Sequence, residues 1–417
     1  MRAAVARPTG IDRVERAYVN WAVNRPGGAW LVGRIGGEGR DGAGAFGARL
    51  HFVPPDAAQA MADMLVKGQA SLDLSARLQP WRAEAPRRAE AAMRRLSRIT
   101  APMRGRGLTK ALTAHFPEGG IWLNTGHENL SGPLLVALSA AGLRSVVLIH
   151  DLIPITHPEF ARPEAARRFS TRLDAALAAD RHLYNSKATA RGVTAYAELR
   201  KRPLPPGDVL RLGVEAPAAP RAIAPTASQP GGAGHFVQLG TIEGRKNHLL
   251  TLMLWRGLTE DVASGPAPHL HIVGRRGWSA EQAIAMLDRS ETVGRTVFEH
   301  RDLGDDAVAA LLAEARALLF PSFAEGYGLP LGEALAAGVP VIAADLPALR
   351  ELGGDVPEWL APQDGPGWLA AIRDYARPGS PRRNAQLARL AEWRRPRWDS
   401  HFARLEEVLE KVGATRS

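Results

Sequence analysis

The chain has 417 residues, of which 45% are hydrophobic, and carries a net charge of +10 at neutral pH. This length is too great for one hydrophobic core and predicts two domains of about 200 residues each. The chain contains no cysteine, which excludes disulfides, thiolate metal sites and cysteine nucleophiles.

The positive charge is concentrated in the first half. Residues 1–213 carry a net charge of +13 and residues 214–417 a net charge of −3, and the excess is greatest between Lys67 and Lys110. Such a basic face favours an anionic lipid surface, a phosphate-bearing acceptor or nucleic acid. We find neither a long uncharged apolar run nor a signal-peptide pattern, so we expect a cytoplasmic protein that can lie on the inner face of a membrane.

The first predicted helix begins just after Gly10, because apolar residues between 11 and 21 recur every three or four positions. A glycine at a helix N-terminus permits close approach of a ligand, although Thr-Gly also begins many helices for capping alone. The glycine-rich residues 27–50 predict a hairpin or loosely ordered strands, and the Arg-rich residues 80–110 predict a helix and loops. A strand at 121–124 and a helix around 134–138 follow.

Two short buried strands then end in polar residues. Residues 146–149 are apolar and are followed by His150 and Asp151, and residues 181–184 are followed by Asn185 and Ser186. Ligands of open α/β sheets bind outside the carboxyl ends of the strands, which places His150 where chemistry would occur. Ser186 is suited to cap the next helix, and this role alone explains it as well as an acceptor contact does.

Residues 214–234 are dense in Ala, Pro and Gly and predict a linker between domains. The strand 236–239 follows it, and a helix starts near Asn247. Arg245 and Lys246 lie between the two, where adjacent cations can neutralise a diphosphate. Strands at 269–273, ending in Gly274, and at 296–300 come next, followed by a helix capped by Asp305. Because His269 and His271 have no carboxylate partner at suitable spacing, we expect no metal site.

The most informative stretch runs from residue 317 to residue 338. An apolar strand, 317–320, precedes a loop rich in Gly and Pro, and Pro330 suits the first turn of a helix that ends near Gly338. Loop N–H groups and a helix N-terminus thus meet at one place, which attracts anions. Glu325 and Glu333 flank that place, and ionised carboxylates are strong acceptors for sugar hydroxyls.

The last segments predict a strand at 339–343, a helix at 347–352 capped by Asp345, and two amphipathic helices separated at Pro396. The first of the two amphipathic helices carries Leu387, Leu390 and Trp393. The second carries Trp398, Phe402, Leu405, Val408 and Leu409.

The segment from Phe320 to Gly353 resembles the signature of the family 4 retaining glycosyltransferases, which have the GT-B fold. The resemblance implies that Glu325 faces the transferred sugar, that Glu333 holds the ribose, and that Arg245 and Lys246 bind the donor diphosphate. It further implies donor contacts by the backbone of Gly326, Tyr327, Gly328 and Leu329, and by Gly10, Gly274 and Phe298. His150 would contact the donor sugar, and Asp151 and Ser186 would lie beside the acceptor.

We therefore expect an α/β protein with two doubly wound Rossmann-like domains. The expected parts are an acceptor-binding domain at 1–213, a linker at 214–234, a nucleotide-sugar-binding domain at 235–395 and a helix at 396–417 that crosses back. The expected activity is retaining transfer of a hexose without a metal or other cofactor. Glu325, His150, Lys246 and Arg245 would be the catalytic residues.

The run from His150 to Pro154 is similar to mannosyl- and rhamnosyltransferases of bacterial surface polysaccharide synthesis. It implies GDP-mannose as the first donor to consider and a lipid-linked oligosaccharide or polysaccharide as the acceptor. Two alternatives remain at this level. One is a nucleotide-sugar epimerase or hydrolase on the same architecture, and the other is a basic nucleic-acid-binding protein. Because no nucleic-acid-binding motif accompanies the Arg cluster, we do not expect a nucleic-acid partner.

Overall fold

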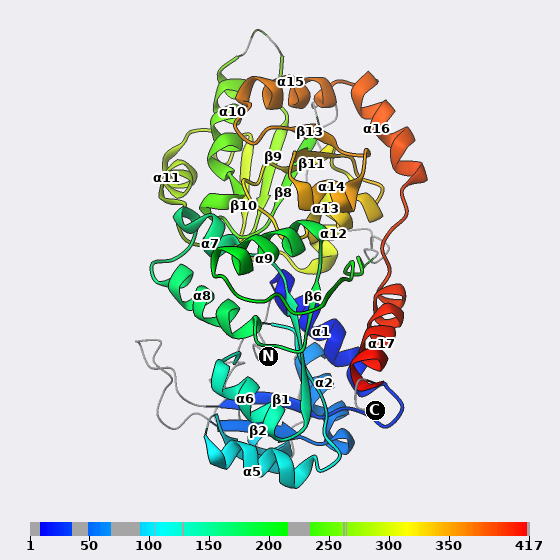
Figure 1. Cartoon of the computed structure of the whole chain (residues 1–417). Coiled ribbons are helices and arrows are strands. Elements are labelled where there is room, and N and C mark those ends of the chain that lie inside the picture. Colours follow the sequence, from blue (N-terminus) through cyan, green and yellow to red (C-terminus); the bar gives the residue numbers. More distant parts are fainter. Residues whose placement is uncertain are drawn as a thin grey trace, which may run out of the picture.

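The computed structural model describes residues 9–35, 49–67, 92–103, 105–126, 129–215, 234–261, 263 and 265–414. Figure 1 shows two lobes, each built around a parallel sheet, with the last helix running beside the lower lobe. Residues 68–91, which include the first part of the Arg-rich stretch 80–110, and residues 216–233 of the predicted linker lie outside the described part of the chain.

The described residues of the first half of the chain form two sheets. A three-stranded antiparallel sheet contains β1 (Leu31–Ile35), β2 (Arg49–Val53) and β3 (Ile99–Pro102). A four-stranded parallel sheet has the order β4 (Gly120–Asn124), β5 (Leu143–Ile149), β6 (Arg181–Tyr184) and β7 (Gly207–Val209). The expected hairpin is confirmed as β1 and β2. Strand β3 was not expected, because only Ile99 and Ala101 of its four residues are buried and so short an alternation is hard to read.

Helices of this half pack on the sheets or join their strands. They are α1 (Gly10–Val23), α2 (Pro55–Lys67), α5 (Arg106–His115), α6 (Gly132–Ala140), α7 (Ile153–Thr156), α8 (Ala165–Ala176) and α9 (Lys187–Leu199), with the short 3-10 helix η1 (Pro158–Phe160). Helix α1 begins at Gly10, and a capping box between Thr9 and Asp12 fixes its start. Ser186 caps α9 as expected, since its hydroxyl accepts from the backbone of Thr189.

The second half forms one six-stranded parallel sheet. Its order is β10 (Val297–His300), β9 (His269–Val273), β8 (His235–Leu239), β11 (Ala317–Phe320), β12 (Val341–Ala344) and β13 (Glu358–Leu360). The chain fills one side of β8 first and then crosses to β11 on the other side. The strand order therefore reverses between β8 and β11, which is where doubly wound sheets bind ligands.

Seven α-helices and one 3-10 helix accompany this sheet in the described residues. They are η2 (Gly244–Lys246), α10 (His248–Glu260), α11 (Glu281–Arg289), α12 (Asp305–Ala313), α13 (Leu329–Ala336), α14 (Pro347–Gly353), α15 (Gly365–Ala376) and α16 (Pro381–Glu392). Pro330 lies in the first turn of α13, as expected, and Gly338 follows the helix with a φ of 76°.

Two expected helix caps are wrong. Asp305 is the first residue of α12, and Gly304 occupies the capping position. Asp345 instead binds Arg350 at 2.7 and 2.9 Å, and Leu346 precedes α14. An acidic residue is favourable anywhere near a helix N-terminus, so its presence in the sequence does not fix which position caps the helix.

The last helix, α17 (Trp398–Ala414), packs on the first half of the chain. His401 bridges two elements of that half, because its ring contacts the Arg211 carbonyl at 2.9 Å and the Tyr18 hydroxyl at 2.8 Å. Phe402 stacks on Trp21 of α1 with ring centroids 5.2 Å apart. Figure 1 shows α17 beside α1, far along the chain but adjacent in space.

Candidate active site

The loops that follow β8 and β11 are joined at the point where the strand order reverses. The Phe323 backbone N–H donates to the Arg245 carbonyl at 2.8 Å. The Asn247 amide donates to the carbonyls of Pro321 and Pro362 at 3.2 and 2.9 Å. The two loops therefore form one rigid edge, from which the predicted cations and the first predicted glutamate project.

An ion cluster of four side chains lies on this edge. Lys246 Nζ and Arg245 Nη1 are 2.5 and 2.9 Å from the same oxygen of Glu325. Arg245 Nε is 2.7 Å from Glu243. The Lys246 ammonium also lies 4.6 Å from the ring centre of Phe320. Two cations and two carboxylates thus neutralise one another, and we refer to Glu243, Arg245, Lys246 and Glu325 as the ion cluster.

Burial sets the electrostatics of this cluster. Desolvation raises the pKa of Glu325, but Arg245 and Lys246 outweigh it and lower the value to about 2. Desolvation lowers the pKa of Lys246 and raises that of Glu243, in each case against the attraction of its opposite charges. Glu325 is therefore ionised and can only accept hydrogen bonds. The cations, however, are already occupied by carboxylates rather than exposed to solvent, which the sequence did not indicate.

The glycine after Glu325 lies against the end of β5 in the other half of the chain. A Cβ on Gly326 would lie 2.4 Å from the His150 carbonyl oxygen and 2.8 Å from the Asp151 Cβ. The Ser186 hydroxyl donates to the Gly326 carbonyl at 3.1 Å. The structure thus brings His150, Asp151 and Ser186 to the loop that carries Glu325, and only glycine allows this approach.

His150 and Asp151 are held in defined orientations. His150 Nε2 donates to the Thr125 carbonyl at 2.6 Å, and burial lowers the pKa of the imidazole. Asp151 accepts from the Ile153 backbone at 3.0 Å. Burial raises the pKa of this carboxyl, while nearby Arg245 acts in the opposite direction. A neutral imidazole of this kind can orient a sugar hydroxyl without adding charge.

The second predicted glutamate has a different partner. Glu333 in α13 forms an ion pair with Arg13 in α1 rather than with Arg245 or Lys246. A Cβ on Gly10 would lie 3.8 Å from Leu329, so the starts of α1 and α13 face each other. Gly10, Leu329 and Glu333 are therefore grouped, as the resemblance implied. Arg13, one turn after Gly10 on the same helix face, was missed.

Among the remaining predicted donor residues, the side chains of Phe298 and Tyr327 contact other residues of the chain. A Cβ on Gly274 would lie 1.9 Å from the Gly240 carbonyl, which shows how tightly the loops after β8 and β9 pack. Phe298 stacks on His271, with ring centroids 5.2 Å apart. The Tyr327 hydroxyl donates to the Leu212 carbonyl at 2.6 Å, so this side chain is directed to the other half of the chain. Gly328 has a φ of 94° at the start of α13.

An aromatic group next to the ion cluster was also missed by sequence reasoning. Phe160 stacks on Phe323 with ring centroids 5.4 Å apart, and its carbonyl accepts from the Trp278 indole at 2.9 Å. A Cβ on Gly244 would lie 3.1 Å from Phe160. Trp278 is exposed and Phe160 is half-buried. Their contact joins the two halves of the chain and therefore leaves no local signal in the sequence.

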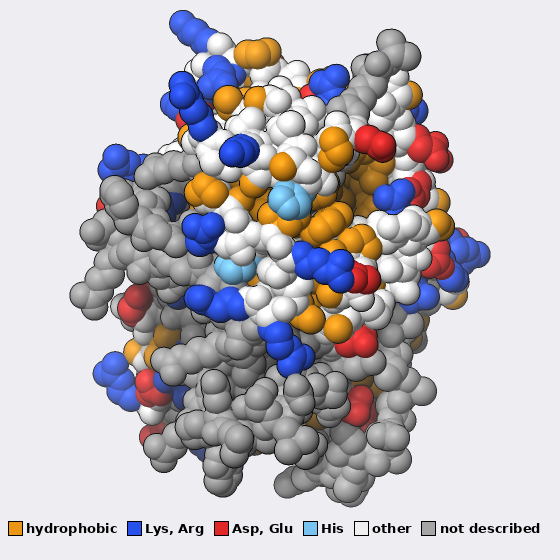
Figure 2. All heavy atoms as spheres, turned by 90° about the horizontal axis from the view of Figure 1, so that it is seen from below, with side chains coloured by type: hydrophobic (Ala, Val, Ile, Leu, Met, Phe, Trp, Pro, Cys, Tyr) orange, Lys and Arg blue, Asp and Glu red, His pale blue; other side chains and the backbone are white. Residues whose placement is uncertain are grey.

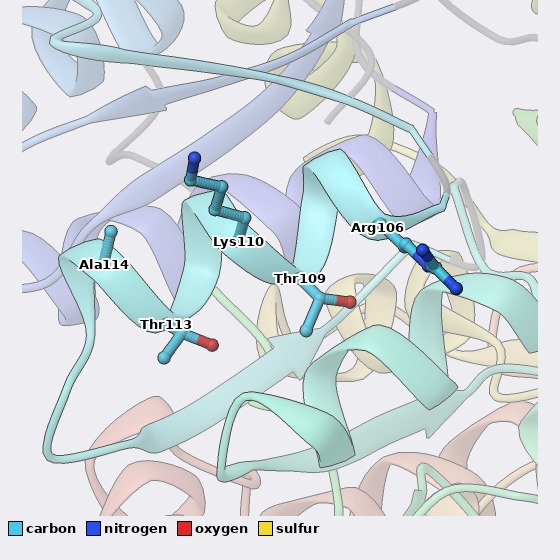
Figure 3. A pocket seen from close by; sticks show the side chains of 5 residues that line it. All are labelled: Arg106, Thr109, Lys110, Thr113 and Ala114. Carbon is cyan, nitrogen blue, oxygen red and sulfur yellow. The ribbon is translucent and has the colours of Figure 1, made fainter.

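A cavity of about 540 Å³ lies elsewhere, on one face of α5 (Figure 3). Its lining consists of Arg106, Thr109, Lys110, Thr113 and Ala114. None of them was predicted as a site residue, and the helix belongs to the lower lobe, whereas the ion cluster follows strands of the upper sheet. Among the described residues, no group of three or more His, Asp or Glu side chains could hold a metal ion. Nor is any described helix long and apolar enough to cross a membrane.

We report three of the matches that comparison with known proteins gives. Residues 234–377 match the family model described as "Glycosyl transferases group 1". The serotype-specific mannosyltransferase WbdA of Escherichia coli is 30% identical over 264 residues, which are 58% of this chain and 32% of WbdA. The O-antigen chain mannosyltransferase B of Escherichia coli is 31% identical over 170 residues, 40% of this chain and 43% of that protein. The matched regions thus span less than half of either relative.

Solved structures share the fold at low sequence identity. The α,α-trehalose 6-phosphate synthase of Burkholderia multivorans has a TM-score of 0.55 at 14% identity, covering 74% of this chain and 73% of that one. This likeness concerns the arrangement of the two parallel sheets and their helices.

Proposed function

We propose that this chain, a GT-B protein with a glycosyl transferases group 1 domain at residues 234–377, is a retaining glycosyltransferase. It would move a hexose from a nucleoside-diphosphate sugar to a hydroxyl of an acceptor. The observation that carries the proposal is the meeting of Arg245, Lys246 and Glu325 at the strand-order reversal, beside His150. Arg and Lys suit a diphosphate, and an ionised carboxylate suits the hydroxyls of a hexose.

The cations would act on the leaving group. As the bond between the anomeric carbon and the diphosphate oxygen breaks, negative charge develops on that oxygen. Arg245 and Lys246 are held on a buried edge, where fixed charges stabilise such development more than they would in water. The acceptor oxygen bonds to the anomeric carbon on the same face, and its proton passes to the departing diphosphate.

Glu325 would change partners during the cycle. In the structure it neutralises both cations through one oxygen. A bound diphosphate brings its own negative charge to Arg245 and Lys246, which frees carboxylate lone pairs for hexose hydroxyls. His150 would hold a further hydroxyl, and Asp151 and Ser186 would lie beside the acceptor. We assign no covalent role to Glu325, because in the proposed transfer the acceptor oxygen bonds directly to the anomeric carbon on the face that the diphosphate leaves.

The names of the relatives support mannose as the sugar, so GDP-mannose is the first donor to test. A lipid-linked oligosaccharide or polysaccharide is the proposed acceptor. Figure 2 shows Lys and Arg side chains around an area of hydrophobic side chains on the lower face. On the helices of this lobe, Arg106 and Lys110 are exposed and Val136 is 71% exposed. Such a face favours peripheral contact with the inner surface of an anionic membrane.

The direct test incubates the purified full chain with GDP-mannose, UDP-sugars and dTDP-sugars, with and without lipid-linked acceptor, in the presence of EDTA. We expect transfer from one donor class that persists in EDTA, and an α-linked product from an α-linked donor by NMR. Loss of the donor without acceptor, at the rate seen with acceptor, would instead indicate an epimerase or hydrolase.

Substitutions test the assignment of the cluster. Lys246→Ala and Glu325→Ala are each expected to lower kcat/KM by about 100-fold or more, as removal of a transition-state contact does. Glu260→Gln on the exposed face of α10 is the control, because Glu260 pairs only with Arg256 in the described residues and lies outside the cluster. If the two cluster variants kept turnover within about tenfold, equivalent to ~1.4 kcal/mol, the assignment would be wrong.

A further inference from the structure

Arg13 and Glu333 form an ion pair between the two halves of the chain. Arg13 lies in the first turn of α1, whose start is fixed by the Thr9 and Asp12 capping box, and Glu333 lies in the second turn of α13. Their side chains are 38% and 23% exposed. The pair therefore borders solvent at the place where a Cβ on Gly10 would contact Leu329.

The charges around Glu333 are mostly negative. Burial raises the pKa of this carboxyl, and Glu215 after β7 and Asp305 at the start of α12 raise it further. Arg13 on α1 acts against all three, both by its charge and by its hydrogen bond. Without Arg13, the carboxyl would take up a proton at higher pH than it does in the intact protein.

We propose that Arg13 is a positioning residue of the donor site, which acts through Glu333 by holding one of its oxygens. This inference rests on the proposed function, together with the role implied by the family resemblance, in which Glu333 accepts hydrogen bonds from the ribose hydroxyls. An ionised carboxylate has about four lone-pair positions, so one bond from Arg13 leaves acceptors for both hydroxyls. Arg13 thereby keeps Glu333 ionised and oriented while the nucleotide binds.

An ion pair with a purely structural role would have the same geometry as the pair of Arg13 and Glu333. The chain contains a matched example of such a pair. Arg25, near the C-terminal end of α1, binds Glu406 of α17 through Nε at 2.8 Å and through Nη2. Both pairs join α1 to an element more than 300 residues away, with similar exposure. Arg25→Gln therefore reports what loss of such a pair does to the fold, apart from the nucleotide.

The experiment measures nucleotide binding by isothermal titration calorimetry on the full chain. GDP and UDP are tested first, and the tighter one is compared with its 2′,3′-dideoxy form, so that the ratio of the two affinities reports the ribose contact. In the wild type we expect a ratio of about tenfold or more, as for charge-assisted hydrogen bonds. Glu333→Gln should reduce this ratio to about threefold or less.

The pH dependence of the ratio tests whether Arg13 acts on Glu333 through its charge or only fills space. In Arg13→Gln the ratio should fall more steeply than in the wild type as the pH is lowered from 8 to 6, because loss of Arg13 lets Glu333 gain its proton at higher pH. Arg13→Lys should restore the wild-type profile, and Arg25→Gln should keep it. The exchanged pair Arg13→Glu with Glu333→Arg should recover thermal stability without recovering the ribose ratio.

Three results would overturn the inference. These are an unchanged ratio in Arg13→Gln at both pH values, tighter nucleotide binding in that variant, or a restored ribose ratio in the exchanged pair. Tighter binding would mean that Arg13 competes with the ribose. A wild type that binds neither nucleotide, but keeps its fold, would contradict the proposed function itself and is thereby distinguished from failure of the Arg13 inference.

Discussion

Charge balance within the ion cluster determines which partner each of its side chains binds. Lys246 is 7% exposed and Glu243 is 4% exposed, so water can hydrate neither charge well. Glu325 satisfies both cations through one oxygen. Removing one member of such a buried group leaves an uncompensated charge, which typically costs about 3–5 kcal/mol. The same residues that would bind the donor therefore also stabilise one another in the folded protein.

Glu325→Gln should separate these two roles. The variant removes the negative charge that competes for Arg245 and Lys246, so GDP without a sugar should bind about tenfold tighter than it binds the wild type, equivalent to ~1.4 kcal/mol. Transfer of the sugar should fall, because the amide offers fewer acceptor positions to the hexose. Calorimetry with GDP at fixed salt and an activity assay measure the two effects. Weaker GDP binding in the variant would refute the competition.

Gly326→Ala tests the close approach between the two halves. A methyl group there would lie 2.4 Å from the His150 carbonyl, so the loop that carries Glu325 must shift. We expect transfer to fall by about 100-fold, since displacement of reacting groups by about 1 Å can have this effect. Gly257→Ala in α10 is the control, because a Cβ there meets no atom within 4 Å. Equal activity of the two variants would exclude a tight contact at position 326.

At the scale of elements, the sequence predicted the strands better than the contacts between elements. The stretches that form β5, β6, β8 and β11 are short and mostly buried, so each could be recognised from its own residues. The helix caps at Asp305 and Asp345 were wrong because an acidic residue suits several positions of a first turn.

The candidate site was predictable for the same local reasons, but only in part. Arg245, Lys246 and Glu325 stand in loops whose glycines and strand context mark them. Arg13 carries no such mark, because nothing near it in the sequence indicates that α1 faces α13. Likewise, occupation of the cations by Glu325 depends on burial and on pairing across 79 residues, neither of which a linear pattern contains.

The docking of α17 makes a prediction at this scale. The buried Tyr18 hydroxyl donates to His401 Nε2 at 2.8 Å, while Nδ1 of the same ring donates to the Arg211 carbonyl. Tyr18→Phe leaves Nε2 without its donor and should destabilise the protein by about 1–3 kcal/mol. Differential scanning fluorimetry should show a lower Tm. Tyr196→Phe is the control, since its partner Asp174 also binds Arg200 and lies near the surface.

At the scale of the whole molecule, the two halves are joined by contacts of several kinds around the ion cluster. Glu351 of α14 accepts the backbone N–H groups of Lys187 and Ala188 at 2.6 and 2.7 Å, at the start of α9. Phe160 stacks on Phe323, and Gly326 lies against His150. Because these contacts surround the place proposed for the sugar, donor binding and the relative position of the halves should be coupled.

The stability of the whole chain should depend on pH through its buried histidines. Burial, together with Lys246, lowers the pKa of His248 to about 3, and burial lowers that of His401 to about 4. The unfolded chain takes up these protons near pH 6.5, before the folded chain does. The stabilisation is therefore complete above pH 6.5 and is lost as the pH falls towards the folded values, by about 2 kcal/mol per histidine at pH 5.

A single variant isolates the contribution of one histidine to the pH dependence of stability. Carboxyls with a raised pKa, such as Asp151, change the stability in the opposite direction on acidification. His401→Gln removes one titrating ring, so its Tm deficit relative to the wild type should be largest at pH 8 and should shrink at pH 5 as the wild type loses its advantage. The reason is that protonation of the unfolded wild type no longer has a counterpart in the variant. Thr113→Ala, on the exposed face of α5, is the control, because it removes no titrating group and should show the same deficit at both pH values. A deficit for His401→Gln that grows on acidification would mean that this ring is charged in the folded protein, contrary to its burial between Tyr18 and the Arg211 carbonyl.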